Sequence, residues 1–152
     1  DGLLAPRLRR KNQLARDAVV DGPPAELHGS PAVILDRLHI LGCTQAELSE
    51  ERLEVTLYLR GGERLARGDV LELVLKGSDR RTVALLEPLD GAYPFGSWQD
   101  GVTVAQPVVF DRRLVGREPA FLSVAVTRAG KRLQVTEGDG VALNTAPVCM
   151  VE

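Results

Sequence analysis

Residues 52–60 read Arg-Leu-Glu-Val-Thr-Leu-Tyr-Leu-Arg, in which apolar and polar side chains alternate without a break. Successive side chains of a β-strand point to opposite faces of a sheet. The leucine and valine residues at every second position therefore share one face, and Glu54, Thr56 and Tyr58 share the other. This pattern predicts an antiparallel strand with one face in a core and the other in water.

Similar short segments, separated by turn residues, flank this strand on both sides. The pattern predicts strands over residues 32–41, 70–76, 81–87, 102–110, 121–128, 131–136 and 148–151. Gly77-Ser78-Asp79 and Ala129-Gly130 predict two hairpins, and Pro107 predicts that its strand is an edge strand or carries a bulge. Seven or eight such strands predict an all-β fold, an antiparallel β-sandwich of the immunoglobulin-like or jelly-roll-like kind.

The first 30 residues follow a different pattern. Apolar residues recur at helical spacing over residues 6–20, with Pro6 in the first turn, and predict a short helix. Asp21-Gly22-Pro23-Pro24 predicts a linker, so the chain divides into a basic amphipathic helix with a Pro-rich linker (1–30) and a sandwich domain (31–152). The basic face of the helix would dock on a partner or an anionic membrane surface, or is simply solvated; it consists of Arg7, Arg9, Arg10, Lys11 and Arg16.

Composition limits the classes of function. The chain has 152 residues, 44% apolar and 26% charged, which suits one globular domain with its own core. With a net charge of −2 and no aromatic residues among the basic ones of the helix, no nucleic-acid partner is predicted. No apolar run approaches the roughly 20 residues that span a bilayer. Because the chain begins at Asp1 rather than Met, either a preceding segment has been removed or, as we favour, the chain is part of a longer protein.

A turn-rich stretch, residues 90–96, leads into Ser97-Trp98-Gln99-Asp100-Gly101. Three aromatic residues lie close together here, namely Tyr93, Phe95 and Trp98. Aromatic side chains on a loop can stack on sugar rings, which makes these three a candidate binding site. The alternative, which we favour, is that Trp98 folds back and closes the end of the core.

Two cysteines, Cys43 and Cys149, lie 106 residues apart, in the first and last predicted segments of the sandwich. First and last strands of a sandwich are often neighbours, so a disulfide fits, and closing so long a loop stabilises by roughly 4–5 kcal/mol in the chain-entropy model. The alternative is two buried free thiols. Export from the cytoplasm would favour the disulfide, and both alternatives stay open.

No motif in the sequence marks a chemical site. His28 and His39 have no second ligand at metal-binding spacing, no serine lies in a Gly-x-Ser-x-Gly elbow, and no glycine-rich turn precedes a helix that would bind phosphate. We therefore predict no catalytic residue, no metal and no cofactor. A site that assembles only in three dimensions is the alternative.

Three segments in order carry a family resemblance: residues 52–60, residues 97–102 (Ser-Trp-Gln-Asp-Gly-Val), and residues 121–126 followed by Gly-Lys-Arg-Leu-Gln-Val at 130–135. They resemble the extracytoplasmic β-sandwich domain at the C-terminus of some bacterial multi-spanning membrane glycosyltransferases. The resemblance spans residues 34–136 and implies architecture and location rather than an activity. Within it, Glu118-Pro119-Ala120-Phe121 stands where that family has a Pro-Gly-x-Tyr turn, and Leu59 stands where it has an aromatic residue.

The sequence and the resemblance together predict a non-catalytic interaction module. We expect it to be an accessory domain of a larger membrane-associated bacterial assembly, outside the cytoplasm, that contacts a protein partner or a glycan. A small enzyme and an intracellular structural subunit are the alternatives, the second of which would keep Cys43 and Cys149 as thiols.

Overall fold

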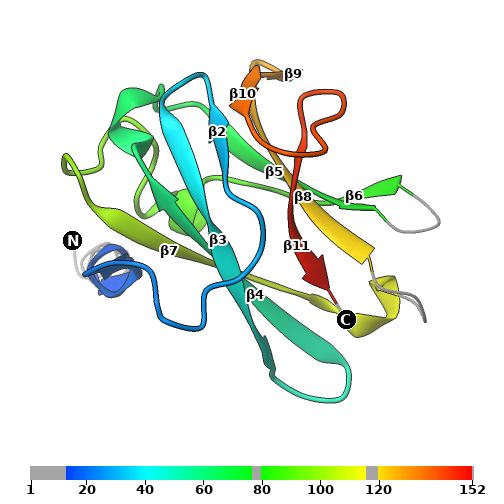
Figure 1. Cartoon of the computed structure of the whole chain (residues 1–152). Helices are drawn as coiled ribbons and strands as arrows, with labels where there is room; N and C mark the ends of the chain where they lie inside the picture. Colours follow the sequence, from blue (N-terminus) through cyan, green and yellow to red (C-terminus); the bar gives the residue numbers. More distant parts are fainter. Residues whose placement is uncertain (1–12, 77–79, 116–119, 152) are drawn as a thin grey trace, which may run out of the picture.

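The computed structural model describes residues 13–76, 80–115 and 120–151, which form a sandwich of two antiparallel sheets with one short helix at residues 13–18 (Figure 1). The predicted all-β fold is confirmed. The strands are β1 (Val19–Val20), β2 (Ala32–Ile34), β3 (Leu38–Glu47), β4 (Arg52–Arg60), β5 (Val70–Lys76), β6 (Arg80–Leu86), β7 (Thr103–Asp111), β8 (Ala120–Arg128), β9 (Lys131–Arg132), β10 (Val135–Glu137) and β11 (Ala146–Val151). The described residues thus hold more strands than predicted, because four of them are only two or three residues long.

One sheet has the strand order β1-β7-β4-β3-β2-β10, and the other has the order β11-β8-β5-β6 with β9 paired to β8. Three 3-10 turns, η1 (Gly62–Arg64), η2 (Pro88–Gly91) and η3 (Arg112–Leu114), lie in the connections between strands. Apolar side chains from both sheets form one continuous core. The two layers cross each other in Figure 1, with β3, β4 and β7 in one and β5, β8 and β11 in the other.

The strand β4 lies in the middle of its sheet, between β3 and β7. It pairs with β7 along its whole length, from Arg52 opposite Asp111 to Arg60 opposite Thr103. The four apolar side chains that alternate along it are at most 2% exposed. The predicted strand and its buried face are therefore confirmed.

The single strand predicted over residues 32–41 is wrong, because the chain reverses at residues 35–37. Leu35 and Asp36 both have a φ of 53°, and the Arg37 N–H donates to the Ile34 carbonyl at 3.0 Å. Two left-handed residues in succession make a tight hairpin turn whose twist matches that of its strands. Strands β2 and β3 pair across this turn, with Ala32 opposite Ile40.

The hairpin predicted across Ala129-Gly130 is present but shorter than expected. Strand β9 pairs with β8 over two residues only, and the chain then crosses to the other sheet, where β10 pairs with β2. The Gln134 carbonyl accepts from the Leu35 N–H at 2.9 Å, which holds the crossing segment against the β2–β3 turn. The other predicted hairpin is confirmed as the β5–β6 pair, although its turn, residues 77–79, lies outside the described residues.

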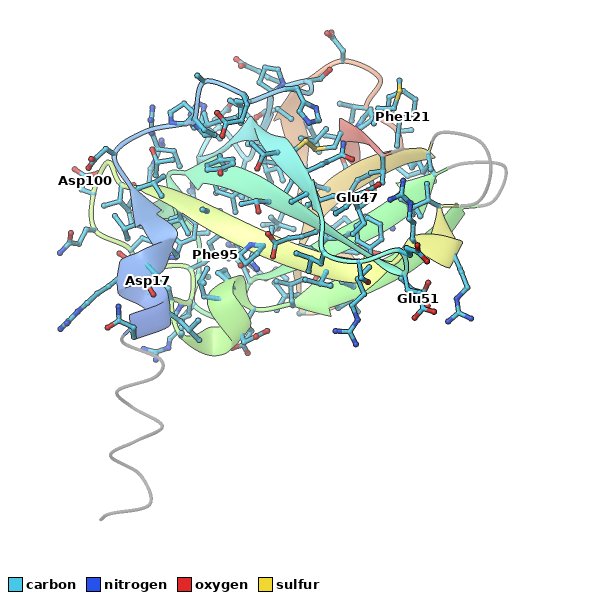
Figure 2. All side chains as sticks on the ribbon, turned by 90° about the horizontal axis from the view of Figure 1, so that it is seen from below. Asp17, Glu47, Glu51, Phe95, Asp100 and Phe121 are labelled. Carbon is cyan, nitrogen blue, oxygen red and sulfur yellow. A yellow bond between two sulfur atoms is a disulfide. The ribbon has the colours of Figure 1, made fainter. Side chains whose placement is uncertain are left out.

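The helix predicted over residues 6–20 is present at residues 13–18, and residues 6–12 lie outside the described residues. The prediction is wrong for Val19 and Val20, because these residues pair with β7 as a strand. The chain then forms β1, which pairs with β7 through Val19 opposite Val104. Figure 2 shows the helix, with Asp17 labelled, at the margin of the sandwich beside β7. None of the helical structure in the described residues is long and apolar enough to cross a membrane.

Candidate functional site

The segment that follows η2 carries the three aromatic residues, and two of them are in the core. Phe95 is fully buried and Trp98 is 4% exposed. The Trp98 Nε1–H donates to the Tyr93 carbonyl at 2.8 Å, and the Trp98 ring centroid lies 5.3 Å from that of Phe95. Trp98 therefore closes the core. Of the three aromatic residues that we predicted as a binding site, only Tyr93 has a ring that a ligand could contact.

A neighbouring loop, residues 61–69, packs against the Trp98 ring. The Gly96 N–H donates to the Gly62 carbonyl at 2.9 Å. A Cβ atom on Gly62 would lie only 2.4 Å from the Trp98 ring, so the backbone of this loop is in direct contact with the indole. Glycine is required here because the ring occupies the space of a side chain.

We call Phe95 and Trp98 the aromatic plug. The Tyr93 ring packs on Trp98 and lines an open hollow on the surface. It stacks on Trp98 with ring centroids 5.7 Å apart and an interplanar angle of 19°, and its hydroxyl accepts from the Gln99 N–H at 2.8 Å. The hollow has a volume of about 570 Å³ and is lined by Ala15, Arg16, Val19, Tyr93 and Gln99. The structure thus brings Arg16, from the predicted basic helix, together with Tyr93; the other predicted basic residues, Arg7, Arg9, Arg10 and Lys11, lie outside the described residues.

A second hollow, of about 400 Å³, lies where the edges of the two sheets meet. Leu14 of the helix, Leu86 of β6 and Val108 of β7 contribute apolar walls. The buried side chain of Gln106 closes its base, since the amide oxygen accepts from the Leu89 N–H at 2.7 Å and the amide nitrogen donates to the Pro107 carbonyl at 2.8 Å.

The edge of β7 at this hollow is blocked against further strand pairing. Within the described residues, β7 pairs with β4 along one side and with β1 on the other, where β1 reaches only Thr103 and Val104. Pro107 therefore lies on an edge, as predicted. Proline has no N–H to offer, and the Pro107 carbonyl is already bonded to Gln106. The sequence did not point to Gln106, whose role depends on the η2 turn folding against β7.

Two buried acidic residues are paired with arginines. The Asp69 carboxylate is fully buried and accepts from Arg128 through both oxygens at 2.8 Å, and from the Ala66 N–H at 2.9 Å. Burial raises the pKa of Asp69, but the hydrogen bonds from Arg128 and Ala66 outweigh burial, so the pKa lies below its usual range. Glu72, 8% exposed, likewise accepts from Arg132 at 2.7 and 3.0 Å.

No spacing or motif could have indicated these pairs. Their members lie 59 and 60 residues apart and meet because β5 pairs with β8 and, for Arg132, because β8 pairs with β9. Each carboxylate accepts two hydrogen bonds from a guanidinium, which suits a structural role better than proton transfer.

Cys43 and Cys149 form a disulfide that joins β3 in one sheet to β11 in the other. Both cysteines are fully buried. The segment that we predicted as a linker passes over this bond: the His28 N–H and carbonyl pair with Cys43 at 3.0 and 2.9 Å, and the Ser30 N–H donates to the Val148 carbonyl at 2.9 Å. The segment is thus bonded to both sheets.

His28 lies beside the disulfide, with its ring nitrogens 3.7 and 3.9 Å from the Cys43 sulfur, and His39 is exposed on β3. Within the described residues, no group of three or more His, Cys, Asp or Glu side chains is arranged to hold a metal ion.

The fold and these contacts define a disulfide-bridged antiparallel β-sandwich that carries an aromatic plug at one end. Comparisons of the chain with protein-family models, with curated proteins and with solved structures found no match.

Proposed function

We propose that this chain is a non-catalytic interaction module of a membrane-associated assembly outside the cytoplasm, and that it binds a glycan or a protein partner in the hollow beside Tyr93. One observation carries the proposal: the hollow combines an aromatic ring with two exposed polar side chains, Arg16 and Gln99.

The geometry of the hollow suits a ligand with both apolar and polar faces. The Tyr93 ring is fixed from one side by Trp98 and by its bond to Gln99. A rigid aromatic surface binds the apolar face of a sugar ring or an apolar side chain at low entropic cost. Arg16 and Gln99 add hydrogen-bond donors that hydroxyl, carboxylate or carbonyl groups accept from.

Two further features support a non-catalytic module and a location outside the cytoplasm. The buried carboxylates of Asp69 and Glu72 are held by arginines, which favours a structural module over an enzyme. The disulfide favours an oxidising compartment. The resemblance of residues 52–60 and 97–102 to the accessory domain of membrane glycosyltransferases agrees with both.

The test is an NMR titration of the ¹⁵N-labelled chain with N-acetylglucosamine oligomers and with acidic oligosaccharides of the bacterial envelope. We expect the resonances of Tyr93, Gln99 and the Trp98 indole to shift, and the variant R16A/Q99A to bind at least fivefold more weakly. The control variant R52A/Q134A removes the same residue types from exposed positions elsewhere in the sandwich.

Protein binding is tested with a photo-crosslinking amino acid at position 99 in living cells. One discrete adduct that disappears in R16A would support a protein partner. The proposal fails if no sugar shifts these resonances at millimolar concentration and no discrete adduct forms.

A further inference from the structure

Three turns that are distant in the sequence meet at one end of the sandwich, and we call this surface the basic end. It consists of residues 35–37, 60–69 and 127–132, at the top of Figure 1. A Cβ atom on Gly61 would lie 2.1 Å from the Arg37 carbonyl, and the Arg37 guanidinium donates to the Arg64 carbonyl at 3.3 Å. The first two turns are therefore in contact, and the Asp69–Arg128 pair joins the third to them.

The basic end has a charge opposite to that of the whole chain. Its three segments hold seven basic and three acidic residues, whereas the complete chain has a net charge of −2. Two of the seven cations are paired with buried carboxylates: Arg128 with Asp69, and Arg132 with Glu72, which lies just outside the three segments. The surface is therefore a local positive region on a chain whose remainder is acidic.

Three of the cations are exposed and available to a ligand. Within the described residues, the side chains of Arg64, Arg67 and Lys131 make no hydrogen bond or ion pair. The backbone that carries them is nevertheless fixed, because Asp69 accepts from both Arg128 and the Ala66 N–H across the loop. Cations on a rigid backbone lose little conformational freedom on binding.

We propose that the basic end docks on the surface of an anionic lipid bilayer. Such a surface presents delocalised negative charge and requires only exposed cations, each of which strengthens binding about fivefold. Proteins bind single-stranded nucleic acid largely through aromatic rings that stack on its bases, and the aromatic residues next to this loop, Phe95 and Trp98, are buried. The inference goes beyond the proposed ligand site and does not depend on it.

The test is flotation of the chain with vesicles of 70% phosphatidylcholine and 30% phosphatidylglycerol, against vesicles of phosphatidylcholine alone, at 50 and 300 mM NaCl. We expect binding to the anionic vesicles only, weakened at least tenfold by the higher salt. We expect R64E/R67E to weaken binding at least tenfold. The control R52E/R113E changes the charge equally at the other end of β4 and β7 and should change binding less than threefold.

Circular dichroism establishes that each variant is folded, and R67E/K131E replaces R64E/R67E if the latter does not fold. Equal binding by R64E/R67E and the wild type would overturn the proposal, as would equal binding to neutral vesicles or none to anionic ones. Binding to a single-stranded oligonucleotide without binding to anionic vesicles would overturn it in favour of nucleic acid.

Discussion

Replacing Gly62 by alanine should destabilise the sandwich by displacing its only tryptophan. The added Cβ would lie 2.4, 2.5 and 2.6 Å from three atoms of the Trp98 ring, where an ordinary contact is 3.4–4 Å. Because the loop backbone cannot yield without disturbing the bond from Gly96, the ring has to move by about 1 Å.

The expected cost follows from what holds the ring. Forcing an extra methyl group into a packed core costs about 1–3 kcal/mol. Weakening the bond from the Trp98 indole to the Tyr93 carbonyl adds about 1 kcal/mol. We therefore expect Gly62→Ala to lower the free energy of unfolding by about 2–4 kcal/mol and to lower the melting temperature by roughly 5–15 °C.

The matched control is Gly68→Ala, in the same loop, where a Cβ atom would meet nothing within 4 Å. Urea unfolding is followed by the fluorescence of Trp98, whose emission in native Gly62→Ala should shift to the red as the ring becomes more exposed. If Gly62→Ala were as stable as Gly68→Ala, or destabilised with unchanged native emission, the assignment of Trp98 as the plug held by Gly62 would be wrong.

Three other predictions follow from covalent and ionic contacts. The variant C43A/C149A should lose about 4–5 kcal/mol, since the disulfide closes a loop of 106 residues, and reduced wild type should match it in urea unfolding. Folding lowers the pKa of Asp69, so its carboxylate stabilises the fold fully above pH 3.8, its usual pKa, and progressively less as the pH falls below that value. Asp69→Asn should therefore remove this part of the acid-induced loss of stability. Urea unfolding at each pH measures the difference. Hydrogen bonds from Arg113 lower the pKa of Asp111 to about 2, and Arg113→Gln should raise it in a carbon-detected NMR titration, whereas an unchanged pKa would rule out this pair in solution.

The sequence predicts the strands best where one face is buried. The alternation over residues 52–60 identifies β4 with its bounds, because the period of two is also the period of the strand. It also indicates the role of Trp98, since a single large aromatic residue in a turn-rich segment is best used to close a core. The early reversal at Leu35-Asp36 escapes prediction because leucine rarely adopts the left-handed conformation that the first central position of this turn requires.

The surfaces depend on contacts that no local pattern contains. Asp69 and Arg128 meet only through the pairing of β5 with β8, and the basic end exists only because three turns meet there. For the disulfide, the sequence offers two cysteines in the first and last segments but cannot tell a bridge from two thiols. The β3–β11 contact decides this, since it brings the two Cα atoms to 6.4 Å.

The two proposed surfaces share one structural support, the loop of residues 61–69. Its backbone at Gly62 contacts the ring beneath the Tyr93 hollow, and its exposed side carries Arg64 and Arg67. A chain seated on a bilayer through this loop would hold the hollow beside the lipid surface, within reach of the membrane-associated ligand that we propose. Gly62→Ala moves the Trp98 ring and leaves the cations of the basic end in place, so we expect it to weaken only binding in the hollow, as R16A/Q99A does. R64E/R67E should weaken only vesicle binding. Weaker vesicle binding by folded Gly62→Ala, in the same vesicle and NMR assays, would show that the two surfaces are not independent.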